Sequence, residues 1–274
     1  MSTDITCASV TTQHDVAIVT LAATGKANRM GPEFWEQLPL LFERLDGDDS
    51  IRVIVLRGAG EHFSYGLDLV AMGQELAPYL APDAGAGERT HLLRTIRRMQ
   101  ESISSVARCR KPVIAAVHGW CIGGALDLIT ACDIRLCSKK AKFSVREVRV
   151  AMVADVGTLA RLPHIVGQGV ARELAFTGDD VDATRALRLG LVNEVFDTPA
   201  ELFEAALSLG GRIARNSPLV VQGIKQVMNA SSERAARDSL DTVALWNAAF
   251  FPSHDLQEAI GAFLEKREPV FKGR

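Results

Sequence analysis

The sequence has little of several features that mark membrane, secreted or metal-binding proteins. Its 274 residues contain no apolar run near the roughly 18 residues of a transmembrane helix. The 5 cysteines form no C-x-x-C pair, and the 6 histidines are scattered, so neither a disulfide framework nor a metal site is predicted. The cysteines are interpreted as reduced, mostly buried thiols, which places the expected protein in the cytoplasm.

An excess of charge of either sign is also missing. The chain has 31 Lys and Arg against 33 Asp and Glu, a net charge of -2. This balance argues against nucleic acid or an anionic membrane as a partner. Neither the start, MSTDITCASV, nor the end, VFKGR, matches a targeting signal, so none is expected. Hydrophobic residues make up 47%, enough for a large core.

Segments typical of strands and helices alternate in the first part of the chain. Short apolar segments at residues 16–22, 51–58 and 111–119 predict buried strands. Residues 72–88 hold two prolines and three glycines, which predicts an irregular insert. A long amphipathic helix is predicted over residues 91–109.

After about residue 155 the pattern becomes helical. Helices are predicted at residues 169–176, 182–189, 199–215, 219–229, 233–250 and 255–266. The predicted fold class is therefore α/β, with an α/β core over residues 1–196 and a helical region over residues 197–274.

A glycine-rich turn separates a predicted strand from a predicted helix in HGWCIGGALDLITACD, residues 118–133. A helix that starts near Gly124 has unpaired N–H groups at its first turn, which suit a phosphate or an oxyanion. The same glycines equally suit a tightly packed turn. A second glycine turn, residues 62–69, exposes an N–H near Leu67, so the two turns are able to converge on one ligand atom.

Three acids follow in the same part of the chain, and each has a plain structural interpretation beside a catalytic one. Asp127 is either a first-turn acid favoured by the helix dipole or a poorly solvated functional carboxylate. Glu147, among arginines, is typical of an ion-paired strand residue. Asp155 is suited to cap the helix that follows it.

Several segments together resemble the crotonase (enoyl-CoA hydratase/isomerase) superfamily, in the family's order. They are GKANRM, HFSYGLDL, RKPVIAAVHGWCIGGALDLITACDIRLCS, KFSVREV and TGDDVDATRALRLGLVNEV. The resemblance extends over about residues 16–272. It implies the crotonase fold of repeated ββα units, a C-terminal trimerisation region, a homotrimer or hexamer, and an acyl-CoA thioester substrate.

The acids indicate the subfamily. Asp127 and Glu147 are 20 positions apart, as are the two glutamates of the family's hydratases, but Asp127 is one methylene shorter. Asp155 stands where hydratases usually have glycine. This set resembles the Δ3,5-Δ2,4-dienoyl-CoA isomerases of fatty-acid β-oxidation. The resemblance implies that Asp155 removes a proton at C2, Glu147 returns one at C6 and Asp127 supports them, with no metal and no cofactor.

The resemblance also implies binding residues. Backbone N–H groups of Leu67 and Gly124 match the family's oxyanion hole. Contacts with the CoA part are implied for Lys26, Arg29, Gly66, Asp68, Leu69, Ala125, Phe263 and Lys266. Lys26 and Arg29 are equally well interpreted as solvated surface cations.

Two other functions stay open at this point. An enoyl-CoA hydratase would use Asp127 and Glu147 to place water at C3 of a 2-enoyl thioester. A non-catalytic acyl-CoA-binding trimer belongs to a different class, and the retained acids argue against it. The sequence does not fix the acyl chain length.

Overall fold

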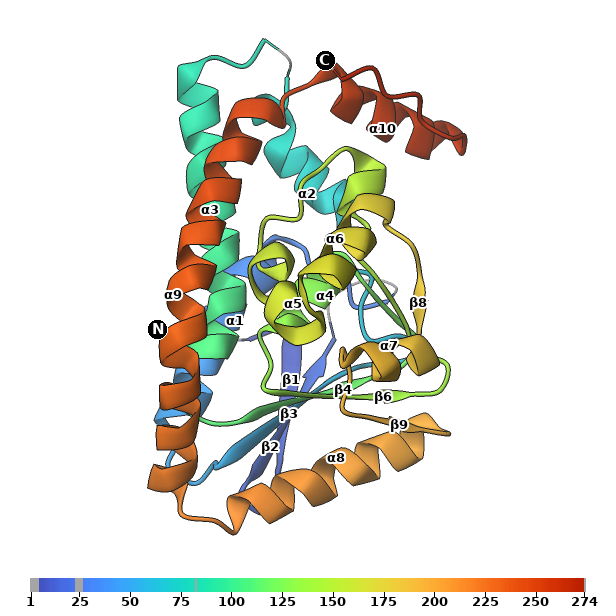
Figure 1. Cartoon of the computed structure of the whole chain (residues 1–274). Coiled ribbons are helices and arrows are strands. Elements are labelled where there is room, and N and C mark those ends of the chain that lie inside the picture. Colours follow the sequence, from blue (N-terminus) through green and yellow to red (C-terminus); the bar gives the residue numbers. More distant parts are fainter. Residues whose placement is uncertain (1–4, 23–26, 82, 274) are drawn as a thin grey trace.

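A six-stranded sheet lies at the centre of the fold (Figure 1). The computed structural model describes residues 5–22, 27–81 and 83–273. The first two strands are antiparallel and the others are parallel, in the order β1 (Ala8–Gln13), β2 (Val16–Leu21), β3 (Val53–Gly58), β4 (Val113–Val117), β6 (Ile134–Ser138) and β9 (Glu194–Phe196). The predicted strands are confirmed to within two residues, whereas the polar strand β1 was not predicted.

Both faces of this sheet are covered, which explains the continuous apolar runs of its strands. Helix α8 (Pro199–Ala214) packs against one face, on side chains such as Val53 and Val55. Neighbouring residues such as Ile54 and Leu56 point into the main core on the other face. Thus α8, the first helix of the predicted helical region 197–274, covers the core sheet. The predicted boundary between residues 196 and 197 stays a prediction.

The remaining elements build the layer above the sheet and confirm the α/β fold class. A small second sheet pairs β5 (Trp120–Ile122), β7 (Lys142–Ser144) and β8 (Val181–Asp182). The helices are α1 (Pro32–Gly47), α2 (Leu69–Leu76), α3 (Ala86–Arg108), α4 (Gly124–Thr130), α5 (Thr158–Val166), α6 (Gln168–Thr177), α7 (Ala183–Leu189), α9 (Pro218–Phe250) and α10 (His254–Glu265). Helix α9 runs beside α3 along one side of the molecule (Figure 1).

Two predictions about helices are wrong. The segment 72–88 is mostly helical: Asp68 caps α2 by accepting hydrogen bonds from two N–H groups of its first turn, and α3 begins at residue 86. The predicted helices 219–229 and 233–250 form the single helix α9. Ser231 and Ser232 do not interrupt it, because their hydroxyls donate to carbonyls one turn earlier.

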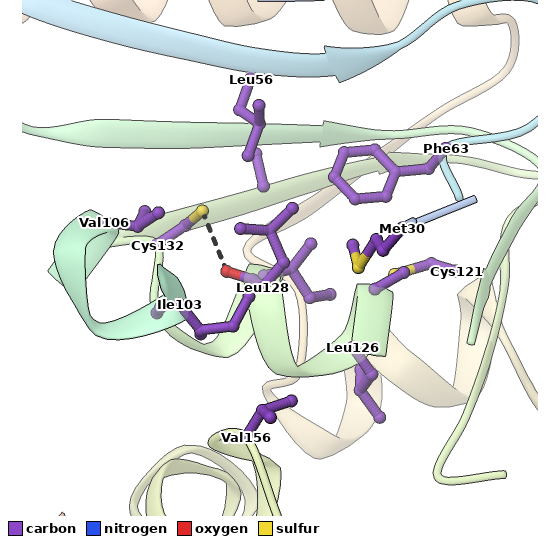
Figure 2. Close-up of a cluster of buried hydrophobic side chains, with 14 of the residues drawn as sticks. Met30, Leu56, Phe63, Ile103, Val106, Cys121, Leu126, Leu128, Cys132 and Val156 are labelled. Carbon is purple, nitrogen blue, oxygen red and sulfur yellow. Dashed lines mark hydrogen bonds between the residues drawn. The ribbon is translucent and has the colours of Figure 1, made fainter. Parts of the chain in front are cut away.

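Helix α4 lies inside the core, and all of its residues are buried. Figure 2 shows Leu126 and Leu128 of α4 among apolar side chains that include Met30, Phe63 and Ile103. Asp127, the only acid in α4, is therefore held by an apolar shell. Within the described ranges, no helix combines the length and apolarity needed to span a membrane.

Candidate active site

A cavity of about 540 Å³ opens at the N-terminal end of α4. Asp127, Glu147 and Asp155 all line it, so the fold brings the three predicted acids together. They come from α4, from a short 3-10 helix (Glu147–Val150) and from the loop before α5. The outer wall is formed in part by α10, far along the chain.

The two glycine turns meet at this cavity. Gly66 has a positive φ of 72°, and a Cβ added there would lie 2.5 Å from Ile122 O and 2.8 Å from Gly124 N. Any side chain would therefore separate the turns. Hydrogen bonds in both directions between Ser64 and the β5 segment keep the turns in register.

The N–H groups of Leu67 and Gly124 are available to a ligand. Both residues line the cavity, and neither N–H donates a hydrogen bond within the part of the chain that the structure describes. A Cβ added at Gly124 would lie 3.7 Å from Leu67 N, so the two groups are close. Two backbone donors beside a cavity are suited to hold an oxygen that gains negative charge.

Asn28 binds its own segment to the start of the glycine turn at residues 62–69. Its buried amide donates to the carbonyls of Ala59, His62 and Phe63 at 2.9 to 3.0 Å. Arg29, the next residue, lines the cavity, which agrees with a contact to a bound ligand.

Asp127 is fully buried and is tied to the backbone. Its Oδ1 accepts a hydrogen bond from the N–H of Thr158, the first residue of α5. Its Oδ2 has no partner among the described residues. Burial raises the pKa of Asp127, and the Thr158 hydrogen bonds and the Arg161 charge partly offset this effect.

Glu147 carries a proton more readily than an ordinary glutamate. Burial, followed by the charge of Asp127, raises its pKa well above the usual range. Its Oε2 has no hydrogen-bond partner among the described residues, as is true of Asp127 Oδ2. Both oxygens are satisfied if Glu147 is protonated and donates to Asp127.

The predicted ion pairing of Glu147 with its neighbouring arginines is wrong. Arg146 pairs with Asp180, and Arg149 pairs with Asp179 at 2.9 Å. These arginines are drawn toward the surface acids that precede β8, so Glu147 is left facing the cavity.

Asp155 is held by two long helices. Its Oδ2 accepts from Asn247 Nδ2 of α9 at 2.7 Å, and its main-chain oxygen accepts from Gln100 Nε2 of α3 at 2.7 Å. Burial raises the pKa of Asp155 to about 7, although the Asn247 hydrogen bond lowers it. Asp155 does not cap α5, because the cap position is Gly157 and Asp127 takes the first N–H.

The other predicted binding residues fall into two groups. Leu69 and Phe263 line the cavity. Gly66, Asp68 and Ala125 support its wall as a turn, a helix cap and a buried first-turn residue, respectively.

Of the two predicted lysines, only Lys266 lies within the described residues. Lys266 follows α10 in a left-handed conformation and is absent from the lining residues. Lys26 lies outside the described residues.

Several lining residues were not predicted from the sequence. The cavity also receives Trp35, Tyr65, Met99, Met152, Val153, Val156 and Arg267. Asn247 was missed as well, although a polar residue on the buried side of an amphipathic helix is a usable signal.

The sequence profile described as enoyl-CoA hydratase/isomerase matches residues 11–274. The chain belongs to the enoyl-CoA hydratase/isomerase family. A mitochondrial Δ3,5-Δ2,4-dienoyl-CoA isomerase of Dictyostelium discoideum is 43% identical over 94% of this chain and 87% of its own length. A peroxisomal enzyme of the same name from Arabidopsis thaliana is 43% identical over 89% of this chain and 88% of its own.

Solved structures of family members have the same fold. An enoyl-CoA hydratase/isomerase from Mycobacterium paratuberculosis superposes with a TM-score of 0.82 at 30% identity, covering 95% of this chain and 99% of that chain.

Proposed function

We propose that this protein converts a 3,5-dienoyl-CoA into the conjugated 2,4-dienoyl-CoA, a step of fatty-acid β-oxidation. The observation that carries the proposal is that Glu147 and Asp155 line one cavity beside the free N–H groups of Leu67 and Gly124. The relatives that are 43% identical over most of this chain bear the name of this isomerase.

The reaction begins at the thioester. Its carbonyl oxygen accepts hydrogen bonds from Leu67 N–H and Gly124 N–H, which stabilise the enolate that forms when C2 loses a proton. Loss of one such donor typically lowers the rate about 10² to 10³-fold. Arg29, Leu69 and Phe263, which line the cavity, bind the CoA part.

Two carboxyl groups then move the protons. Asp155, ionised, takes a proton from C2, and the electron pair shifts along the diene as the 3,4 and 5,6 double bonds become 2,3 and 4,5. Glu147, protonated, donates its proton to C6. Asp155 ends protonated and Glu147 ionised, and exchange with solvent restores both groups. C2 and C6 are too far apart for one short carboxylate to serve both.

The surroundings of the two groups fit these opposite roles. Asp155 has a pKa of about 7 and an amide donor that stabilises its ionised form. Burial and the charge of Asp127 raise the pKa of Glu147, so it holds its proton to higher pH than an ordinary glutamate, as a proton donor requires. The scheme needs no metal and no cofactor, since the two carboxyl groups and the two N–H groups carry out every step. The CoA part belongs to the substrate.

The hydratase alternative fits the site less well. It requires Asp127 to share in activating a water molecule, whereas Asp127 is fully buried and accepts the N–H of Thr158. Asp155, which that reaction does not need, faces the cavity.

We also propose that the protein assembles as a homotrimer or hexamer. Large apolar side chains are exposed along the helical C-terminal region, among them Leu219, Ile224, Val227, Met228, Trp246, Phe250 and Leu264. A second copy would remove this surface from water. The cytoplasmic location stays a prediction, and the two relatives are named as mitochondrial and peroxisomal.

A panel of 2-enoyl-, 3-enoyl- and 3,5-dienoyl-CoA thioesters tests the proposed function. We expect rapid conversion of the 3,5-dienoyl substrate, followed by the absorbance of the conjugated product. Asp155→Asn is expected to lower this rate about 10² to 10⁴-fold, since it removes the general base.

The alternatives give different results in the same panel. Efficient hydration of crotonyl-CoA without dienoyl conversion, unaffected by Asp155→Asn and increased by Asp127→Glu, would identify a hydratase. Tight acyl-CoA binding with no turnover of any thioester would identify a binding protein.

A further inference from the structure

Asn247 occupies an unusual place for an amide. It lies near the end of α9, 92 positions from Asp155 in the sequence, and only 3% of its surface is exposed. Its Nδ2 donates to Val153 O at 2.8 Å and to Asp155 Oδ2 at 2.7 Å. Both protons of the amide are thus used on the loop that carries the proposed base.

We propose that Asn247 is a positioning residue that aims the Asp155 carboxylate into the cavity and stabilises its ionised form. The proposal rests on the proposed function, because the orientation of Asp155 matters only if it removes the substrate proton.

The geometry separates this role from ordinary packing. The bond to Val153 O fixes the plane of the amide, so its other proton points at the carboxylate. Gln100 fixes the same loop from α3, with 2.7 Å to Asp155 O and 2.9 Å to Leu240 O of α9. Gln100 therefore fixes the backbone of Asp155, whereas Asn247 donates a hydrogen bond to its charged carboxylate.

The charged groups around Asp155 make this donor important. Asp127 of α4 disfavours the ionised form of Asp155, and the charge of Asp155 in turn affects Glu147 of the 3-10 helix. Four cationic groups line the same cavity: Arg146 and Arg149 at the 3-10 helix, Arg29, and Arg267 after α10. None of them forms an ion pair with Asp155 among the described residues, so the Asn247 amide is the direct polar partner of its carboxylate.

Asn247→Leu tests the proposal through the pH profile of kcat/KM for the dienoyl substrate. Loss of a hydrogen bond to a charged group is expected to raise the pKa of Asp155 by about one to two units. The acid limb of the profile then moves to higher pH by that amount. Activity falls about tenfold at pH 7 and largely recovers at pH 9, with KM little changed.

Two matched variants isolate the effect. Gln100→Met removes the donor to the main-chain oxygen and is expected to lower kcat without moving the acid limb. Asn229→Leu removes an α9 amide that donates to Ala107 O at 3.0 Å, away from the cavity, and is expected to leave activity and profile unchanged.

A readout that needs no turnover separates this proposal from the proposed function. Titration of ¹³C-labelled aspartate carboxyls, with Asp155 assigned by its absence in Asp155→Asn, reports the Asp155 pKa directly. A raised value in Asn247→Leu supports the proposal even if the substrate differs. An unmoved value, or an equal shift in Asn229→Leu, overturns it.

Asn247→Asp is the second variant, because it keeps the side-chain shape while removing both donors. It is expected to shift the Asp155 pKa in the same direction and further, since it adds a like charge. Failure of both Asn247 variants to fold would indicate a structural role and overturn the proposal.

Discussion

Asp127 and Asp155 are the same residue type at one cavity, yet they are built into the protein in opposite ways. Asp127 lies on a helix that is buried on all sides, and its carboxylate accepts a backbone N–H. Asp155 lies on a loop, faces the cavity, and is held by side-chain amides from two long helices.

This difference indicates which acid performs the chemistry. A fully buried carboxylate that accepts the N–H at a helix start has little freedom to meet a substrate, so we expect Asp127 to tune its neighbour Glu147. A carboxylate that lines the cavity and accepts an amide N–H at one oxygen is stabilised in its charged form and stays accessible to a substrate. Four predictions test this contrast and the site around it, the largest kinetic effect first.

The largest effect is expected for Glu147→Gln, which removes the proposed proton donor. Isomerisation should fall about 10² to 10⁴-fold. Exchange of the C2 hydrogen with solvent deuterium should persist, because Asp155 and the oxyanion site remain. Mass spectrometry of recovered substrate measures the exchange.

Asp155→Asn is the matched control for that experiment. It should abolish the C2 exchange together with isomerisation. If Glu147→Gln abolishes the exchange while Asp155→Asn retains it, the two roles are reversed.

A smaller loss, about 10² to 10³-fold in kcat, is expected for Gly66→Ala. The new Cβ would meet Ile122 O and Gly124 N and would move one oxyanion donor away from the other. Gly60→Ala is the control, because Gly60 has a similar φ of 71° but open space around its Cα. Equal kinetic losses in both variants would point to backbone strain alone.

The smallest kinetic effect is expected for Asp127→Asn. Removal of the nearby charge should lower the Glu147 pKa, so the alkaline limb of the pH profile moves to lower pH by about one unit. Activity below pH 7 should change only a few-fold.

The same variant has a predicted effect on stability. The pKa of Asp127 is higher in the folded state than in the unfolded state. The stability that the protonated side chain contributes to the fold is therefore fully present below the unfolded-state pKa, and it is lost as the pH rises through the folded-state pKa. Asn does not ionise, so the Asp127→Asn variant does not lose this stability at high pH. Its free energy of unfolding at pH 8 should exceed that of the wild type by on the order of 2 kcal/mol, with little difference at pH 4. Urea unfolding at both pH values measures this, and a less stable variant at pH 8 would contradict the assignment.

Much of the core was predictable because its signals are local. Continuous apolar runs identified β2, β3 and β4, since strands covered on both faces need no polar alternation. The polar strand β1 was missed because it lies at the sheet edge. Helix α2 was missed because the prolines and glycines of residues 73–87, most of which follow the helix, are typical of a loop.

The sequence by itself determined the strand–helix order, the glycine turns and the spacing of the acids, because these depend on neighbouring residues. Only the tertiary structure decided that the three acids line one cavity, and which of them is bound by a backbone N–H and which by a side-chain amide. Asn247 and Gln100 reach Asp155 from helices 92 and 55 positions away. No local pattern carries such contacts, because they arise when α3 and α9 pack side by side against the loop before α5.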